Sequence, residues 1–157
     1  MVLWFVGMVS LAVWLVFHDP RFDYRVLAIG ALLPDIVDAL FGGARLMHTV
    51  IGNVGLLLVV MVTTIGRPAK RRMLLALPIG SFLHLVFDGA FANTSVLWWP
   101  ITGTSFDDAP LPSIDRGAIS VVLELIGLAV LVWFWRRFQL GDPERRRILV
   151  RTGHLVG

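Results

Sequence analysis

Cysteine is absent from the 157 residues of the chain, which excludes disulfides, thiolate zinc sites and cysteine nucleophiles. Charged residues are also scarce: they make up 16% of the chain, whereas 57% of the residues are hydrophobic. Soluble domains typically carry about 25% charged residues, so this composition excludes an ordinary soluble domain and indicates an integral membrane protein. Histidine, aspartate and glutamate remain as the residue types that could react or bind a metal.

Apolar segments long enough to cross a membrane recur along the chain. A helix rises about 1.5 Å per residue, so roughly 17 to 25 residues cross the hydrocarbon core of a bilayer. The sequence therefore predicts an all-α, polytopic membrane bundle of about five spans. The predicted spans are residues 1–17, 26–41, 49–65, 73–91 and 118–135. We expect residues 1–140 to form this single domain and residues 141–157 to form a basic cytoplasmic tail.

The basic residues indicate how the bundle is oriented. Arginine and lysine gather in residues 67–72 and again in residues 136–151, and the net charge is +3. In membrane proteins such clusters mark cytoplasmic loops, so we interpret them as topology signals and expect no nucleic acid partner. The predicted location is the inner or plasma membrane, with residues 42–48 and the polar stretch 92–117 on the extracytoplasmic side.

Five ionisable side chains fall at the outer ends of the predicted spans. They are Asp35, Asp38, His48, His84 and Asp88. An ionisable group at the membrane centre costs about 2.5–3.5 kcal/mol on the insertion scale, so several together need a compensating partner, water or metal. A shared cation would compensate all of them.

The spacing of these residues supports a shared cation. Asp35 and Asp38 are three residues apart, and His84 and Asp88 are four apart, so each pair points to one side of a helix. Imidazole and carboxylate ligands suit zinc best, with manganese or iron as alternatives. Because five ligands exceed one tetrahedral zinc, the set predicts one six-coordinate ion or two neighbouring ions, at a site facing the extracytoplasmic side.

Several of these residues lie in strings that resemble a known family. The strings are GALLPDIVD at residues 30–38, His48-Thr49, HLVFDG at residues 84–89 and WWPI at residues 98–101. In this order they resemble the membrane-bound metal-dependent hydrolases grouped around YdjM. The resemblance implies that Asp35, Asp38, His48, His84 and Asp88 bind the metal. It departs from the family pattern at Thr49, where an arginine usually follows the first histidine.

Together these features predict a membrane hydrolase that cleaves an ester or phosphoester of a lipid-like substrate through metal-activated water. Glu124 lies about two turns below the outer start of the fifth span, and we expect it to shuttle the proton. Arg45, three residues before His48, is the candidate for holding a phosphate. Trp98 and Trp99 suit an aromatic belt or a guide for lipid.

Two other functions use the same residues. The acids and histidines could form a path for cations or protons in a transporter-like protein, although the chain has no internal repeat. They could instead join helices in a non-catalytic membrane subunit, with residues 92–117 binding a partner. Metal content separates the three, since an enzyme retains a divalent ion, a transporter exchanges it and a scaffold carries none.

Overall fold

The computed structural model describes residues 1–19, 21–92, 94–104 and 117–156, and every regular element within these ranges is a helix. The longer helices are α1 (Val2–Phe17), α2 (Tyr24–Ala39), α3 (Val50–Thr63), α4 (Pro68–Leu74), α5 (Ala76–Phe87), α8 (Ala118–Arg137) and α9 (Pro143–Thr152). The short ones are η1 (Leu46–His48), η2 (Ala90–Ala92) and α6 (Thr94–Leu97). The expected all-α class is confirmed.

The helices differ in whether they could cross a membrane. Among the described residues, α8 is the one helix that is both long and apolar enough to do so, with 20 residues. The apolar helices α1 and α3 are shorter, at 16 and 14 residues. The number of spans, predicted as five, therefore stays a prediction.

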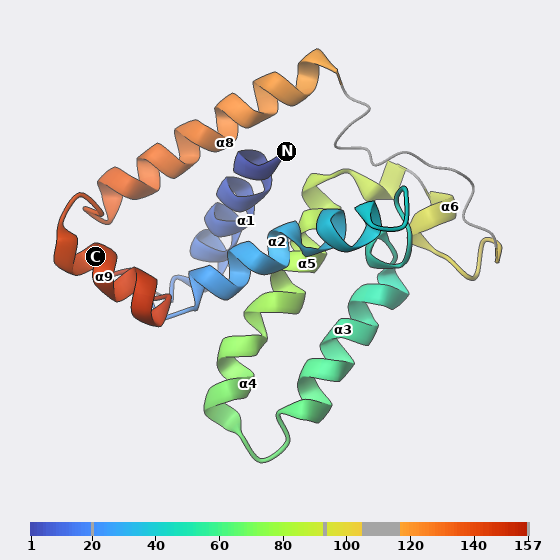
Figure 1. Ribbon diagram of the computed structural model, residues 1–157, viewed down its shortest axis with the longest axis horizontal. Coiled ribbons are helices and arrows are strands. Elements are labelled where there is room, and N and C mark those ends of the chain that lie inside the picture. Colours follow the sequence, from blue (N-terminus) through green and yellow to red (C-terminus); the bar gives the residue numbers. More distant parts are fainter. Residues whose placement is uncertain (20, 93, 105–116, 157) are drawn as a thin grey trace.

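The contact between α2 and α5 is the most extensive in the molecule, and Figure 1 shows α2 crossing its middle beside α5. Glycine lies on both sides of this crossing. A Cβ at Gly30 would collide with the Leu77 carbonyl, and one at Gly80 would collide with the Leu27 carbonyl. The two backbones therefore approach as closely as small-residue interfaces allow in membrane proteins.

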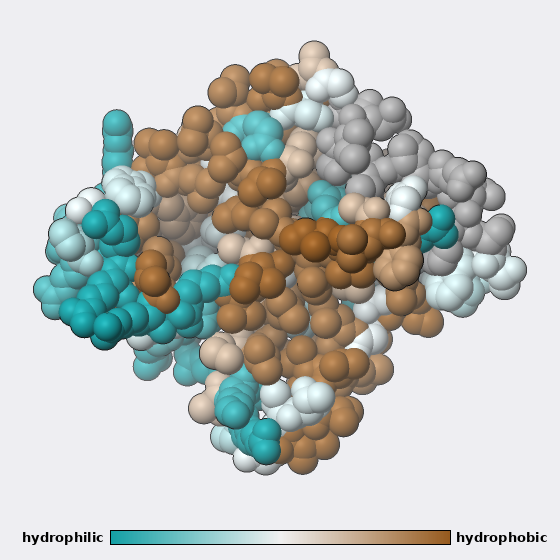
Figure 2. All heavy atoms as spheres, in the orientation of Figure 1, coloured by the Kyte–Doolittle hydropathy of each residue, from teal (hydrophilic) through white to brown (hydrophobic). Residues whose placement is uncertain are grey.

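A second close crossing joins α1 to α8, which run along one side of the molecule in Figure 1. Here Gly7 faces the backbone of Gly127, and a side chain on either would collide with the opposite helix. Most of α8 otherwise lies outside the core, with Gly127 and Phe134 its buried residues. Figure 2 shows broad apolar surface over the central helices, and this surface suits lipid better than water.

The predicted fourth span, residues 73–91, takes in the end of α4, all of α5 and the start of η2 in the structure. Helix α4 begins at Pro68, the chain turns at Leu75, and α5 ends at Phe87. Pro78 explains the break, because proline has no N–H to donate and its ring would collide with the carbonyl four residues earlier. The kink expected near Pro78 and Gly80 thus occurs at Leu75.

The basic C-terminal segment is folded rather than trailing. Asp142 caps α9 by accepting a hydrogen bond from the amide of Glu144, and Gly153 ends the helix at a φ of 77°. Leu155 then packs into the main hydrophobic core at 3% exposure. The C-terminal segment thus contains a helix and packs on the core, and its expected place as a basic cytoplasmic tail, residues 141–157, stays a prediction.

Substitution of Gly30 tests the helix crossing. Gly30→Ala places a methyl group against the Leu77 carbonyl and should lower the free energy of unfolding by about 1–3 kcal/mol. Gly55→Ala in α3 is the matched control, because its Cβ would meet nothing within 4 Å. Removing that glycine should stabilise the helix by roughly 0.5–1 kcal/mol. Thermal unfolding in detergent measures both changes, and equal effects would contradict the proposed role of the crossing.

The predicted orientation can be tested directly because the chain has no cysteine of its own. Lys70→Cys and Thr104→Cys, each made singly, should react with a membrane-impermeant maleimide from opposite faces of sealed vesicles. The basic loop at Lys70 should react from the cytoplasmic face. Labelling of both positions from the same face would overturn the topology.

Candidate metal centre

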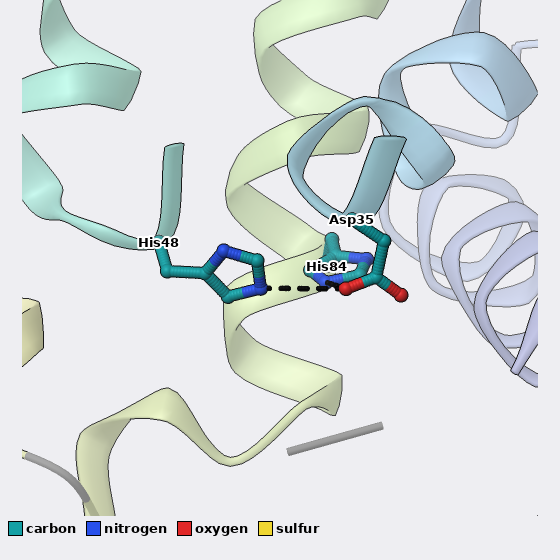
Figure 3. A group of neighbouring side chains, drawn as sticks. All are labelled: Asp35, His48 and His84. Carbon is teal, nitrogen blue, oxygen red and sulfur yellow. Dashed lines mark ion pairs between the residues drawn. The ribbon is translucent and has the colours of Figure 1, made fainter. Parts of the chain in front are cut away.

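Three elements bring Asp35, His48 and His84 together (Figure 3). Asp35 lies in the penultimate turn of α2, His48 ends η1, and His84 lies in α5. One ligand atom from each lies within 4.8 Å of the others. Asp35 Oδ1 is 3.4 Å from His48 Nε2 and 3.5 Å from His84 Nε2. None of these three atoms has a hydrogen-bond partner in the described part of the chain.

The ring of His84 is fixed by a backbone carbonyl. Its Nδ1 lies 2.7 Å from the Ala31 oxygen, and because a carbonyl can only accept, Nδ1 carries the proton. In the neutral ring the lone pair is then on Nε2, which faces Asp35. Phe5 stacks on this imidazole with ring centroids 3.8 Å apart, and the His84 side chain is fully buried.

Asp38 fixes the ring of His48 in the same way. The Nδ1 atom of His48 donates to Asp38 Oδ2 over 2.8 Å, which again leaves the lone pair on Nε2. Histidines that bind a metal usually donate their other ring N–H to a carboxylate or carbonyl, which sets the tautomer and raises the basicity of the imidazole.

Asp38 also organises the loop that carries His48. Its carboxylate accepts backbone hydrogen bonds from Arg45 at 2.7 Å, Met47 at 3.2 Å and His48 at 3.2 Å. These contacts place Asp38 against the loop and the Nδ1 atom of His48, and outside the group of Asp35, His48 and His84. Its expected role as a direct metal ligand stays a prediction.

Asp88 lies beside the group. It caps the C-terminal end of α5, its side chain is fully buried, and its Oδ2 is 4.0 Å from His48 Nε2. The four-residue spacing from His84 therefore does bring this carboxylate near the three grouped side chains. Its role as a further ligand stays a prediction.

The two residues expected to act in catalysis lie in different surroundings. Glu124 accepts a hydrogen bond from the Leu3 amide at 2.9 Å and lies 3.8 Å from the N-terminal amine, so it joins α8 to the first turn of α1. It is not part of the Asp35, His48 and His84 group. Arg45 lies in the His48 loop, where its Nε donates to the Phe41 carbonyl at 2.7 Å.

Other contributors to the site were missed from the sequence. The hydroxyl of Thr49 caps α3 by accepting from the Gly52 amide at 2.9 Å, and it donates to the Leu46 carbonyl at 2.7 Å. Asn53 donates to the carbonyls of Met47 and Thr49, on either side of His48. An N-cap threonine before an apolar run was a readable signal. The Ala31 carbonyl and the Phe5 ring carry no sequence signal.

The group fits a divalent cation. Two neutral imidazoles and a carboxylate are the three protein ligands of many catalytic zinc sites, in which a fourth position stays open. Ligand atoms about 2.0–2.1 Å from a tetrahedral ion lie roughly 3.3 Å from one another. The distances of 3.4 and 3.5 Å from Asp35 Oδ1 to the two imidazole nitrogens are close to that separation.

Comparisons of the chain with protein-family models, with curated proteins and with solved structures found no match. The likeness to YdjM-like hydrolases therefore stays a prediction based on the motifs.

Replacement of Asp38 tests the arrangement behind His48. Asp38→Asn keeps the size of the side chain but loses the charge that holds the Nδ1 proton, so affinity for zinc should fall about 10- to 100-fold. Glu124→Gln, a carboxylate outside the group, should leave zinc affinity unchanged. Competition with a chromogenic chelator measures both values. Equal affinities of Asp38→Asn and the parent protein would refute the role given to Asp38.

Proposed function

We propose that the protein is a membrane-embedded, metal-dependent hydrolase of an ester or phosphoester in a lipid-like substrate. The observation that carries this proposal is the convergence of Asp35 Oδ1, His48 Nε2 and His84 Nε2 without hydrogen-bond partners. Zinc is the preferred ion, with manganese or iron as alternatives. The site lies towards the extracytoplasmic face of the inner or plasma membrane in the predicted topology.

An apolar groove near the group supports a substrate with a hydrocarbon chain. It has a volume of about 480 Å³ and lies between α1, α3 and α5, where Val13, Leu57 and Phe82 are among its lining residues. The polar residue that lines this groove is Asn53, which donates hydrogen bonds to the backbone carbonyls on either side of His48. A chain in this groove would place an attached ester near the loop that carries His48.

The parts of the site have separate tasks in this proposal. A bound divalent cation supplies Lewis acidity and lowers the pKa of water to near 7. Asp35, His48 and His84 hold the cation, with Asp88 as a further ligand. Asp38 and the Ala31 carbonyl keep each imidazole in the tautomer that binds metal. Arg45 remains the candidate for a substrate phosphate. Glu124 binds the start of α1 and lies outside the group, so its part in proton transfer stays a prediction.

Metal content is the first test. The detergent-purified protein should contain one or two equivalents of zinc, manganese or iron by elemental analysis. Asp35→Ala and His84→Ala should each lose the metal, since each removes one of three ligands. His18→Asn is the matched control because His18 is the C-cap residue after α1, has a left-handed φ of 48° that asparagine tolerates, and lies outside the group.

Helical circular dichroism and monodispersity must stay unchanged in every variant that is compared. Retained metal in the parent and its loss in the two ligand variants would justify assays with phosphatidate, polyprenyl phosphate and monoacylglycerol. Hydrolysis of one of these by the parent alone would support the proposal. A parent without metal after reconstitution would overturn it and favour a helix-joining role, and rapid exchange of metal without hydrolysis would favour a transporter.

A further inference from the structure

The C-terminal segment folds back onto the start of α2, far from the metal centre. The amide of Tyr24 donates to the Gly153 carbonyl at 2.9 Å, and Arg25 Nη1 donates to the Val150 carbonyl at 2.8 Å. Gly153 has a φ of 77° and lies so close to the Asp23 carboxylate that a Cβ would collide with it. The end of α9 is therefore held in a defined position beside α2.

Beside this contact lies a pocket of about 490 Å³. Its charged and polar lining residues come from the turn before α2, from α2 itself, from α4 and from the C-terminal segment. They are Arg21, Asp23, Arg25, Arg72, Arg151, Thr152 and His154. Figure 2 shows hydrophilic residues gathered over α9, at the side of the molecule away from α6.

Carboxylates neutralise only part of this positive charge. Asp23 pairs with Arg25 at 2.9 Å and caps α2 through the amides of Arg25 and Val26. Burial would raise the pKa of Asp23, but Arg25 and these amides together hold it below its usual value, so the carboxylate stays charged. Asp19 lies 2.5 Å from Arg72 and 3.6 Å from Arg21.

The pocket is lined by four arginines, and the carboxylates of Asp19 and Asp23 neutralise two of these positive charges. A net charge of about +2 therefore remains. Arg151 forms no ion pair with any carboxylate of the described residues. The pocket therefore has both the space and the charge for an anion of about two negative charges.

We propose that this pocket binds a phosphate monoester dianion. Phosphate monoesters carry a charge of about −1.5 to −2 near pH 7, which matches the uncompensated charge. Guanidinium groups bind phosphate through paired N–H donors, and Arg151 and Arg21, which both line the pocket, would supply them. The phosphate belongs to a lipid headgroup or to a soluble phosphate ester, and the chemistry of recognition is the same for both.

The pocket is separate from the metal centre and does not depend on the proposed hydrolase function. Arg25 and Asp35 lie on the same helix, and at about 1.5 Å per residue they are roughly 15 Å apart along its axis. Removal of metal ligands should therefore leave binding of phosphate at this pocket unchanged, and the two proposals can fail independently.

The experiment measures binding to the full chain in nanodiscs. One arm titrates glycerol 3-phosphate and inorganic phosphate into phosphatidylcholine nanodiscs and follows heat by calorimetry. The other arm replaces part of the phosphatidylcholine with phosphatidate and counts retained lipid by native mass spectrometry. Arg151→Gln is the test variant. Arg147→Gln is its matched control, because it removes the same charge from the same helix but lies outside the pocket.

Arg151→Gln should weaken binding about tenfold or more, because it removes a charged hydrogen-bond donor to phosphate, whereas Arg147→Gln should change it less than twofold. Arg21→Gln, at an exposed position, should repeat the loss and guards against a folding defect in one variant. Retention of phosphatidate alone would identify a lipid headgroup, and binding of glycerol 3-phosphate would identify a soluble ester. No binding in either arm, or equal losses in Arg151→Gln and Arg147→Gln, would overturn the proposal.

Discussion

The close approach of α2 and α5 is the contact on which the rest of the structure depends. Gly30 and Gly80 allow the two backbones to meet, and this places the Ala31 carbonyl within 2.7 Å of His84 Nδ1. The same hydrogen bond sets the tautomer of His84 and turns its Nε2 towards Asp35. A larger residue at either glycine would separate the helices, and with them the carbonyl, the imidazole and the carboxylate.

Helix α2 connects two chemically different ends of the protein. Asp23 and Arg25 at its start bind the C-terminal segment and line the basic pocket. Near its end, Asp35 belongs to the group with His48 and His84, and Asp38 accepts a hydrogen bond from His48 Nδ1. Few charged residues occur in this chain, and α2 places several of them at its two ends while its middle packs against α5.

The sequence predicted the apolar helices because uninterrupted apolar runs mark them, but it did not predict the charged helix α9. It also placed a kink near Pro78, whereas the helix breaks at Leu75. It also predicted that Asp35, His48 and His84 would meet. It could not predict the role of Asp38, because that role depends on α2 ending one residue later, and helix ends are poorly defined by apolar patterns. The contact of Glu124 with the Leu3 amide could not be predicted for a different reason, since these two residues lie far apart in the sequence.

The geometry of the group favours a cation over simple helix joining. Where this protein joins elements with a histidine and an aspartate, as in His48 and Asp38, the two atoms lie 2.8 Å apart in a hydrogen bond. Asp35 Oδ1 instead lies 3.4 and 3.5 Å from two imidazole nitrogens, beyond the usual range of such bonds. Each buried polar atom without a hydrogen-bond partner costs about 1–3 kcal/mol, and three occur here together. One divalent ion would satisfy all three, whereas in the neutral tautomers described above no proton lies between these atoms to form a hydrogen bond.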